Sequence, residues 1–383
     1  MISIEREAFI SFLQQLEPRL LEQCCGEKYA RIPRKCRIAK TVVRRICTRF
    51  GKITLKITHV KNTLGEFFSP LLQVLGIRKY QHIPKDIENR IRDKACKMSY
   101  RDVAEDVRNS FEFKISRQEV WRINQSNNPV PISSSKSHKI LLADGTKIKG
   151  INGGHLEPRA LMSIDSGKKE KCLLSLETSK SWDEIAGNLD LEGFRVLVAD
   201  GEQGLAEALV KSHMKFQFCH LHAIRDLSFY LWQDKLEKNA RSEFMKPLKE
   251  ILYTVQNSTK KYFVDKDKAR LLWRIHWANK EINKLIARLK KRECEKSAEF
   301  LERNKKYLFT AAQLAITDNL RVPWNTNVAE RLMKEIGKRT KKKSMRWSAN
   351  GLMSVLSATL KRYFLPPEKR CYKNIYRGDS TGG

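Results

Sequence analysis

The sequence is poor in acidic residues, and it has no long apolar run and no closely paired cysteines. Its 383 residues include 43 Asp and Glu against 75 Lys and Arg. No stretch approaches the roughly 18 uninterrupted apolar residues that a membrane-spanning helix needs, and acids at Glu5 and Glu7 argue against a secretory signal. The nine cysteines include no Cys-x-x-Cys pair, which argues against a zinc ribbon. These absences predict a cytoplasmic protein, associated with the nucleoid if its source is prokaryotic.

The excess of positive charge, formally +32, indicates a polyanionic partner. Such a charge attracts nucleic acid through the release of counterions. The sequence has no Lys-rich amphipathic tail or lipidation signal that would favour a membrane surface instead. Between Lys28 and Gly65 there are twelve Lys and Arg and no acid, a composition that favours contact with phosphate groups. We therefore expect the chain to bind double-stranded DNA.

Residues 1–83 are expected to form a basic N-terminal region. Apolar residues recur at helical spacing in residues 1–27, which predicts an amphipathic helix. Two strands are predicted after it, Val42–Ile46 and Ile53–Thr58, on either side of Phe50 and Gly51.

Residues 84–125 carry three helical patterns that outline a helix-turn-helix DNA-binding segment. Pro84 opens the first helix, and Ser99 and Ser116 can cap the second and third. The exposed side of the third, the recognition helix, would carry Ser116, Arg117, Gln118 and Arg122. A plain helical subdomain is the alternative, because short three-helix patterns are common.

Residues 126–137, rich in Ser, Asn and Pro, form the clearest linker in the chain. Beyond it, strands are predicted at 139–143, 159–164, 172–176, 195–199 and 215–218, with helices near Ser181 and at 202–210. This order predicts an α/β domain over residues 138–365 with a ribonuclease-H-like mixed sheet. An all-helical insertion is expected over about 228–320, interrupted near Asn257-Ser258-Thr259, and residues 366–383 form a basic tail.

Two apolar runs of this domain end in Asp-Gly, at Asp144 and at Asp200. If the two strands are neighbours, both carboxylates lie at one edge of the sheet and can share metal ions. Asp-Gly is also a frequent turn dipeptide, so either one alone would be interpreted as a turn. A further apolar run ends in Asp165, on a strand whose register the sequence leaves open.

A third carboxylate is expected from a basic helix that begins near Asn327. Glu330 is the candidate and Glu335 competes with it, while Asn327 and Glu330 could also be a capping box and nothing more. The cations that follow suit the approach of a phosphodiester. We expect DNA contacts from Lys338, Arg339, Lys341, Lys342, Lys343, Arg346 and Trp347, although Trp347 could instead anchor the core.

A Cys and two His lie close together after the last predicted strand, in Cys219-His220-Leu221-His222. Cys219-x-x-His222 supplies at most half of a zinc site. We therefore favour a local structural or DNA-handling role for Cys219 and His222, with zinc binding as the alternative.

Three carboxylates in this arrangement would hold a pair of Mg²⁺ ions, because hard divalent cations prefer carboxylate oxygen. A two-metal site can drive phosphoryl transfer on a nucleic-acid backbone. The expected catalytic and metal-binding residues are therefore Asp144, Asp200 and Glu330, with Mg²⁺ as the cofactor and Mn²⁺ as its substitute.

In order and spacing, these motifs resemble those of the DDE transposases of the Mutator-like group and of related bacterial and archaeal insertion sequences. The resemblance is clearest over residues 138–360, where a Cys-x-x-His element follows the second aspartate and a long helical segment precedes the glutamate. Residues 45–51 and 99–101 resemble N-terminal features of the insertion-sequence relatives, and residues 346–348 resemble the tail of their final motif.

The resemblance implies an enzyme that cuts DNA at the ends of its own mobile element and joins the freed ends to target DNA. It also implies that Asp144, Asp200 and Glu330 are the metal-binding triad. Because transposition pairs two DNA ends, we expect a homodimer or larger assembly on DNA. Two alternatives stay open: a nuclease on the same fold, and a non-catalytic DNA-binding protein derived from a transposase.

Overall fold

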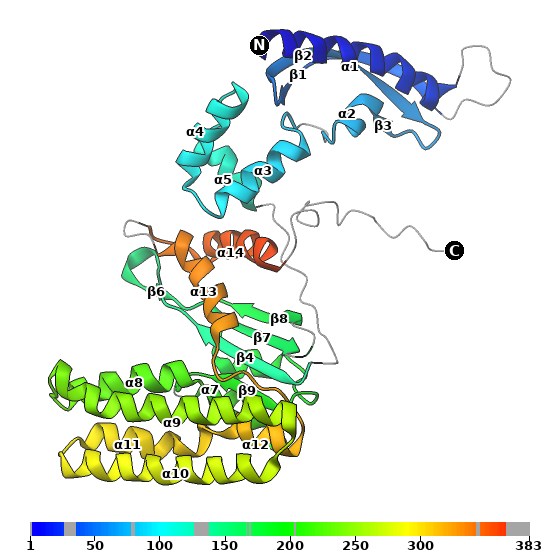
Figure 1. Cartoon of the computed structure of the whole chain (residues 1–383). Coiled ribbons are helices and arrows are strands. Elements are labelled where there is room, and N and C mark those ends of the chain that lie inside the picture. The colour runs from blue at the N-terminus through cyan, green and yellow to red at the C-terminus, as the bar shows by residue number, and fades with distance from the viewer. Residues whose placement is uncertain are drawn as a thin grey trace. The chain divides into compact units, whose positions relative to one another are not determined.

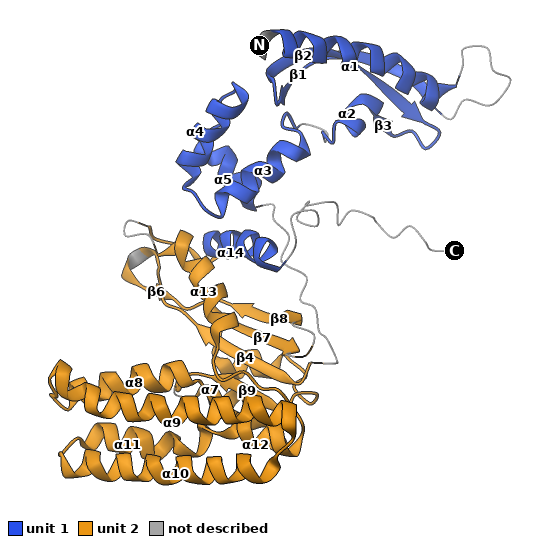
Figure 2. Ribbon diagram, in the orientation of Figure 1, with its two compact units in different colours: residues 1–130, 350–383 blue, residues 131–349 orange. Residues whose placement is uncertain are grey.

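The computed structural model describes residues 2–26, 36–77, 81–125, 138–165, 167, 170–202, 204–341 and 345–364. The chain divides into two compact units, residues 1–130 with 350–383 and residues 131–349 (Figure 2). The predicted linker at 126–137 and the predicted basic tail lie outside the described residues. Among the described helices, none has the length and apolar character needed to cross a membrane.

The first unit begins with a helix that packs on a long antiparallel hairpin (Figure 1). The predicted helix and both predicted strands are confirmed, and Thr48 pairs with Gly51 at the turn. Leu13 of the helix packs against Ile46 and Ile53 of the hairpin in one buried cluster. The elements of this part are α1 (Ile2–Cys25), β1 (Cys36–Thr48), β2 (Gly51–Asn62), β3 (Phe67–Phe68) and α2 (Pro70–Val74).

Three further helices of the first unit lie at the predicted positions. They are α3 (Lys85–Ala95), α4 (Tyr100–Phe111) and α5 (Arg117–Gln125). Their apolar faces meet around Ile91, Val103 and Val120, which are fully buried. Ser99 caps α4 in a reciprocal capping box with Asp102, as its sequence predicts. The last helix, α14 (Ala349–Phe364), belongs to the first unit from residue 350 onward.

The second unit is built on a mixed five-stranded sheet, so the predicted α/β class is confirmed. The strand order is β10-β9-β4-β7-β8. The first three of these strands run parallel, whereas β7 is antiparallel to β4 and β8 is antiparallel to β7. The elements before the helical part are β4 (Ile140–Gly145), β5 (Ile148–Lys149), β6 (His155–Leu156), β7 (Arg159–Asp165), β8 (Glu170–Glu177), α6 (Trp182–Gly187), β9 (Val196–Ala199), α7 (Leu205–Leu209) and β10 (Lys215–Phe218).

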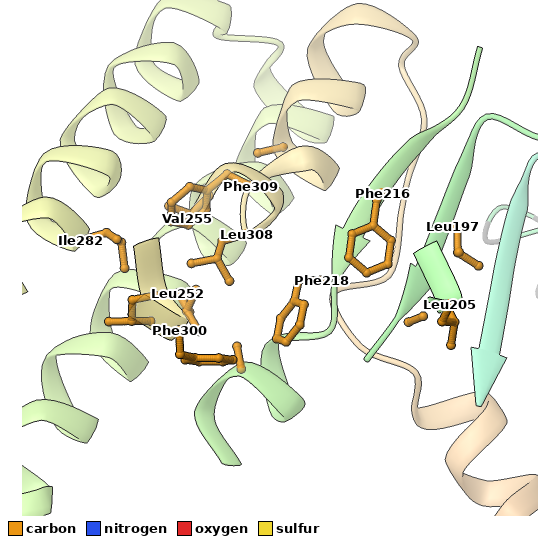
Figure 3. Close-up of a cluster of buried hydrophobic side chains, with 14 of the residues drawn as sticks. Leu197, Leu205, Phe216, Phe218, Leu252, Val255, Ile282, Phe300, Leu308 and Phe309 are labelled. Atoms are coloured by element: carbon orange, nitrogen blue, oxygen red, sulfur yellow. The ribbon is translucent and has the colours of Figure 1, made fainter. Parts of the chain in front are cut away.

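A helical part follows β10 in the sequence and shares one core with the sheet. Phe218 of β10 packs edge-on against Phe300 of the helical part (Figure 3). Phe216 of the same strand packs edge-on against Tyr307. Such dense aromatic packing fixes the sheet and the helices as one body. The elements are α8 (His220–Gln233), α9 (Lys238–Asp265), α10 (Lys268–Lys291), α11 (Glu295–Asn304), α12 (Thr310–Thr317) and α13 (Asn327–Thr340).

The predicted interruption near Asn257-Ser258-Thr259 is wrong, because α9 is continuous through these residues. The hydroxyl of Thr259 donates to the carbonyl of Val255 one turn earlier, at 2.8 Å. This bond lets a buried polar side chain stay inside a helix, where it would otherwise compete with the backbone.

Candidate acidic site at the end of the parallel strands

Asp144 and Asp200 lie at the same level of two neighbouring parallel strands. Leu142 of β4 pairs with Val198 of β9, and each aspartate stands two residues further along the chain, Asp144 within β4 and Asp200 directly after the end of β9. Side chains two residues apart on a strand share a face, so the register places both carboxylates at one end of the sheet. Asp165 ends β7, which is antiparallel to β4 and pairs there through Ile164 and Ile140, so it lies at the opposite end.

The glycine after Asp200 is required by packing. A Cβ atom on Gly201 would lie 2.6 Å from the ring of Phe218, closer than side chains approach one another. At Gly145, after Asp144, a Cβ atom would make ordinary contacts at 3.6 Å. The second Asp-Gly is therefore more than a turn dipeptide, since the absence of a side chain at Gly201 lets the backbone after Asp200 pass close to the buried ring of Phe218.

Glu330 lies in the first turn of α13, which packs against β4. Helix α13 begins at Asn327 with Thr326 in the N-cap position, so Asn327 does not cap it. The Glu330 carboxylate accepts a hydrogen bond from the Thr326 hydroxyl at 3.1 Å, and the competing Glu335 instead pairs with Lys338. Of the two glutamates, Glu330 is the one whose charge acts on Asp144.

The three acids form one electrostatic cluster around Asp144. Burial, together with the charges of Asp200 and Glu330, raises the pKa of Asp144 from 3.8 to about 7. His222 opposes this shift because its positive charge would favour the carboxylate. Asp144 therefore sits where a neighbouring positive charge would stabilise its ionised form.

Cys219 and His222 lie beside this cluster, at the start of α8. Both are buried, and Nδ1 of His222 is 3.7 Å from Oε1 of Glu330. Within the described part of the chain, Cys219, His222 and Glu330 are the set of three His, Cys or acidic residues whose ligand atoms all lie within 4.8 Å of one another. Burial opposes the charged form of both side chains. The hydrogen bond and charge of His222 nevertheless lower the pKa of Cys219, and those of Cys219 raise the pKa of His222, so the pair favours a thiolate and an imidazolium.

Asp226 is a further acid near the site that the sequence analysis did not single out. Burial raises its pKa, and the charge of Asp200 adds to the shift. Its position four residues after His222, on the same face of α8, is the signal that could have identified it.

The predicted DNA-contacting residues fall into exposed and buried groups. Ser116, Arg117, Gln118 and Arg122 are exposed at the start and along the outer face of α5, and Arg122 pairs with Glu119. Exposed as well are Lys338, Lys341 and Arg346, whereas Lys342 and Lys343 lie outside the described residues.

Arg339 and Trp347 are buried and therefore depart from the prediction of a DNA-facing surface. Their exposed fractions are 2% and 8%. The indole N–H of Trp347 donates to the carbonyl of Thr340, and the Arg339 guanidinium lies over the indole ring at 5.0 Å. Trp347 thus has the anchoring role that was the alternative to base stacking.

The first unit contains a basic cavity of about 1,000 Å³ between the hairpin and α2. None of the described residues that line it is acidic. Strand pairing sets Lys40 opposite His59, and Arg44 is held by the carbonyl of Gln81 at 2.6 Å. Its basic lining residues are Lys40, Arg44, His59, His82 and Lys85. Part of the stretch without acids, residues 28–65, therefore lines a concave and positively charged surface that suits phosphate groups.

Comparison with known families connects the site to a class of proteins. A protein-family model with the description "Transposase IS66 family" matches residues 133–353, which is more than half of the chain. The chain belongs to the IS66 family of transposases. This family is distinct from the Mutator-like group, so the resemblance to insertion-sequence transposases is supported and the Mutator-like assignment is not confirmed. No curated protein matches the sequence.

Proposed function

We propose that this IS66-family transposase cuts DNA at the ends of its own element and transfers the freed strand ends to target DNA. The observation that carries the proposal is the pairing of two adjacent parallel strands, which brings Asp144 and Asp200 to the same end of the sheet. The charge of Glu330 acts on Asp144 at the same place. We assign these three residues as the catalytic acids. The strand order, three antiparallel-connected strands followed by two parallel ones, supports a ribonuclease-H-like fold for the second unit.

The acidic cluster fits divalent cations of the hard class. Its donors are carboxylate oxygens, and the pKa of Asp144 is raised first by burial and then by the neighbouring charges of Asp200 and Glu330, a state that a bound cation would relieve. Asp144, Asp200 and Glu330 would hold Mg²⁺, with Mn²⁺ as a substitute. When bound, such ions supply an activated nucleophile and stabilise the charge that develops on the attacking and leaving oxygens.

The chain's own residues would then bind and align the DNA. The exposed Lys338, Lys341 and Arg346 follow Glu330 and would neutralise the phosphates next to the acids. In the first unit, the exposed α5 residues Arg117, Gln118 and Arg122 would read the element's end. Because transposition pairs two DNA ends, the active species on DNA would be a homodimer or a larger assembly. It would act in the same cellular compartment as the DNA of its element.

The test is strand transfer with pre-cut element ends. Full-length protein is incubated with Mg²⁺, a labelled DNA duplex that carries an exposed 3′-hydroxyl end, and supercoiled target plasmid. Joined products would establish a transposase. Cleavage without joining would favour the nuclease alternative, and DNA binding with neither product under Mg²⁺ or Mn²⁺ would favour the non-catalytic alternative.

A further inference from the structure

Glu330 is held by a hydroxyl that occupies a helix-capping position but does not cap the helix. Thr326 is the N-cap residue of α13, and its side chain makes no capping hydrogen bond. Threonine in this position ordinarily accepts a bond from an N–H of the first turn. Here the hydroxyl donates to Oε1 of Glu330 instead, at 3.1 Å, and Thr326 is fully buried. The Thr326 side chain is therefore bonded to the Glu330 carboxylate and not to the backbone at the start of α13.

The same hydroxyl also contacts Cys219, the N-cap residue of α8. It lies 3.5 Å from Sγ of Cys219, which is also fully buried. The backbone N–H of Cys219 donates to the carbonyl of Ala199, the residue before Asp200, at 2.8 Å. A short chain of contacts therefore runs from the backbone next to Asp200, through Cys219 and Thr326, to the carboxylate of Glu330.

The segment that carries Thr326 is tied to the start of α8 at a second point. The N–H of His220 donates to the carbonyl of Trp324 at 2.9 Å, and the two rings are in contact at 4.8 Å. These contacts leave Thr326 little freedom to move away from Cys219. The buried Nδ1 of His222 also lies 3.7 Å from the same carboxylate oxygen.

We propose that Thr326, supported by Cys219, is a positioning residue that fixes the Glu330 carboxylate relative to Asp200 and so sets the affinity of the site for divalent cations. Glutamate has a longer and more flexible side chain than aspartate, so it needs such a constraint to meet two short, strand-borne acids. Groups that bond to a metal-binding carboxylate commonly control its metal affinity. The inference rests on the proposed role of Glu330.

The test compares three threonine variants of the full chain. Thr326→Val keeps the shape and removes the hydroxyl, and Thr326→Ser keeps the hydroxyl. Thr340→Val is the matched control, because Thr340 is buried at the other end of α13 and its hydroxyl donates to the carbonyl of Ile336 within the same helix, at 2.8 Å. Mn²⁺ binding is measured by the electron paramagnetic resonance signal of the unbound ion, and the Mg²⁺ dependence of DNA nicking is measured in parallel.

We expect Thr326→Val to weaken Mn²⁺ binding about tenfold, the lower end of what loss of such a supporting bond costs. Nicking by this variant should recover at high Mg²⁺. Thr326→Ser should bind Mn²⁺ like the wild type, and Thr340→Val should lose stability without a change in metal affinity. Unchanged Mn²⁺ binding in Thr326→Val would overturn the inference. So would stoichiometric zinc in the purified protein that is lost in Cys219→Ser, because Cys219 and Glu330 would then ligate a different ion.

Glu330→Gln separates failure of this inference from failure of the proposed function. If Glu330→Gln nicks DNA like the wild type, the assignment of the third acid is wrong, whatever Thr326 does. If Glu330→Gln is inactive while Thr326→Val keeps its Mn²⁺ affinity, the acid is correctly assigned and the positioning role is wrong.

Discussion

Leu142 and Val198 pair across two parallel strands, and each is followed two residues later by an aspartate. This register brings Asp144 and Asp200 to one end of the sheet. Since β4 and β9 are central and buried, the positions of both backbones are fixed by the core. The acids are therefore held close together at the expense of stability, which leads to the first prediction.

Asp144→Asn should stabilise the metal-free protein at pH 8. The pKa of Asp144 is raised from 3.8 to about 7 by burial and by Asp200. Between these values the folded chain holds a proton that the unfolded chain releases, so stability falls as pH rises through this range. The variant should gain on the order of 4 kcal/mol at pH 8 and almost nothing at pH 4.

Urea unfolding in EDTA at several pH values measures this effect. Asp190→Asn, which removes an exposed acid of the same unit, controls for the loss of one negative charge. An equal gain at pH 8 and pH 4 would show that repulsion at Asp144 is not its source.

Gly201→Ala should destabilise the second unit much more than Gly145→Ala. The new Cβ atom at position 201 would lie 2.6 Å from the Phe218 ring, whereas at position 145 its closest contact would be 3.6 Å. Crowding of this kind costs about 1–3 kcal/mol in a packed core. The midpoints of urea unfolding for the two variants decide the matter, and equal midpoints would contradict the packing role of Gly201.

His220 should make the protein less stable as the solution becomes acidic. Burial lowers the pKa of His220 from 6.5 to about 4. Nε2 bonds to the carbonyl of Leu308 at 2.7 Å and Nδ1 contacts the amide of Gln256 at 2.7 Å, an arrangement that suits the neutral ring. Between pH 6.5 and 4 the unfolded chain takes up a proton that the folded chain does not, so stability falls as pH falls.

The expected loss from His220 over this range is about 3 kcal/mol. It is measured as the pH dependence of the free energy of unfolding. His220→Gln should be less stable at pH 7 but should lack this part of the slope, and an unchanged slope would mean that other groups cause it.

The basic cavity of the first unit should contribute to the salt dependence of DNA binding. The double variant Lys40→Gln, Arg44→Gln should reduce the slope of log Kd against log salt by about 2, since each phosphate contact contributes about 0.9. Lys52→Gln with Lys56→Gln is the matched control, because these lysines alternate onto the other face of the hairpin. Fluorescence anisotropy with labelled duplex measures both, and equal slopes would place the DNA elsewhere.

The sequence was most informative where local patterns determine structure. Short apolar runs bounded by turn residues predicted the hairpin and the five strands of the sheet, and Ser99 predicted the cap of α4. The polar run Asn257-Ser258-Thr259 misled because burial of Val255 and Thr259 on one helix face outweighs local propensity. Arg339 and Trp347 misled because a basic run also contains inward-facing positions, which charge alone does not distinguish.

The site itself was only partly predictable. Asp144 and Asp200 carry a local signal, a buried strand followed by Asp-Gly, and their adjacency depends on strand order. The choice of Glu330 over Glu335, and the contacts of Thr326 with Cys219, depend on the packing of segments more than 100 residues apart, as the separation of 107 residues between Thr326 and Cys219 shows. Residue type and spacing carry no information on such contacts.

The most direct test compares wild type with Asp200→Asn in nicking a supercoiled plasmid that carries the element's ends. Both proteins are used at concentrations that give equal DNA binding, with Mg²⁺ or with EDTA. We predict nicking by the wild type in Mg²⁺ alone and at least a hundredfold loss in Asp200→Asn, as expected when a group essential to catalysis is removed (about 10²–10⁴-fold). Equal nicking by the two proteins, or nicking by the wild type in EDTA, would contradict a metal-dependent site at these acids.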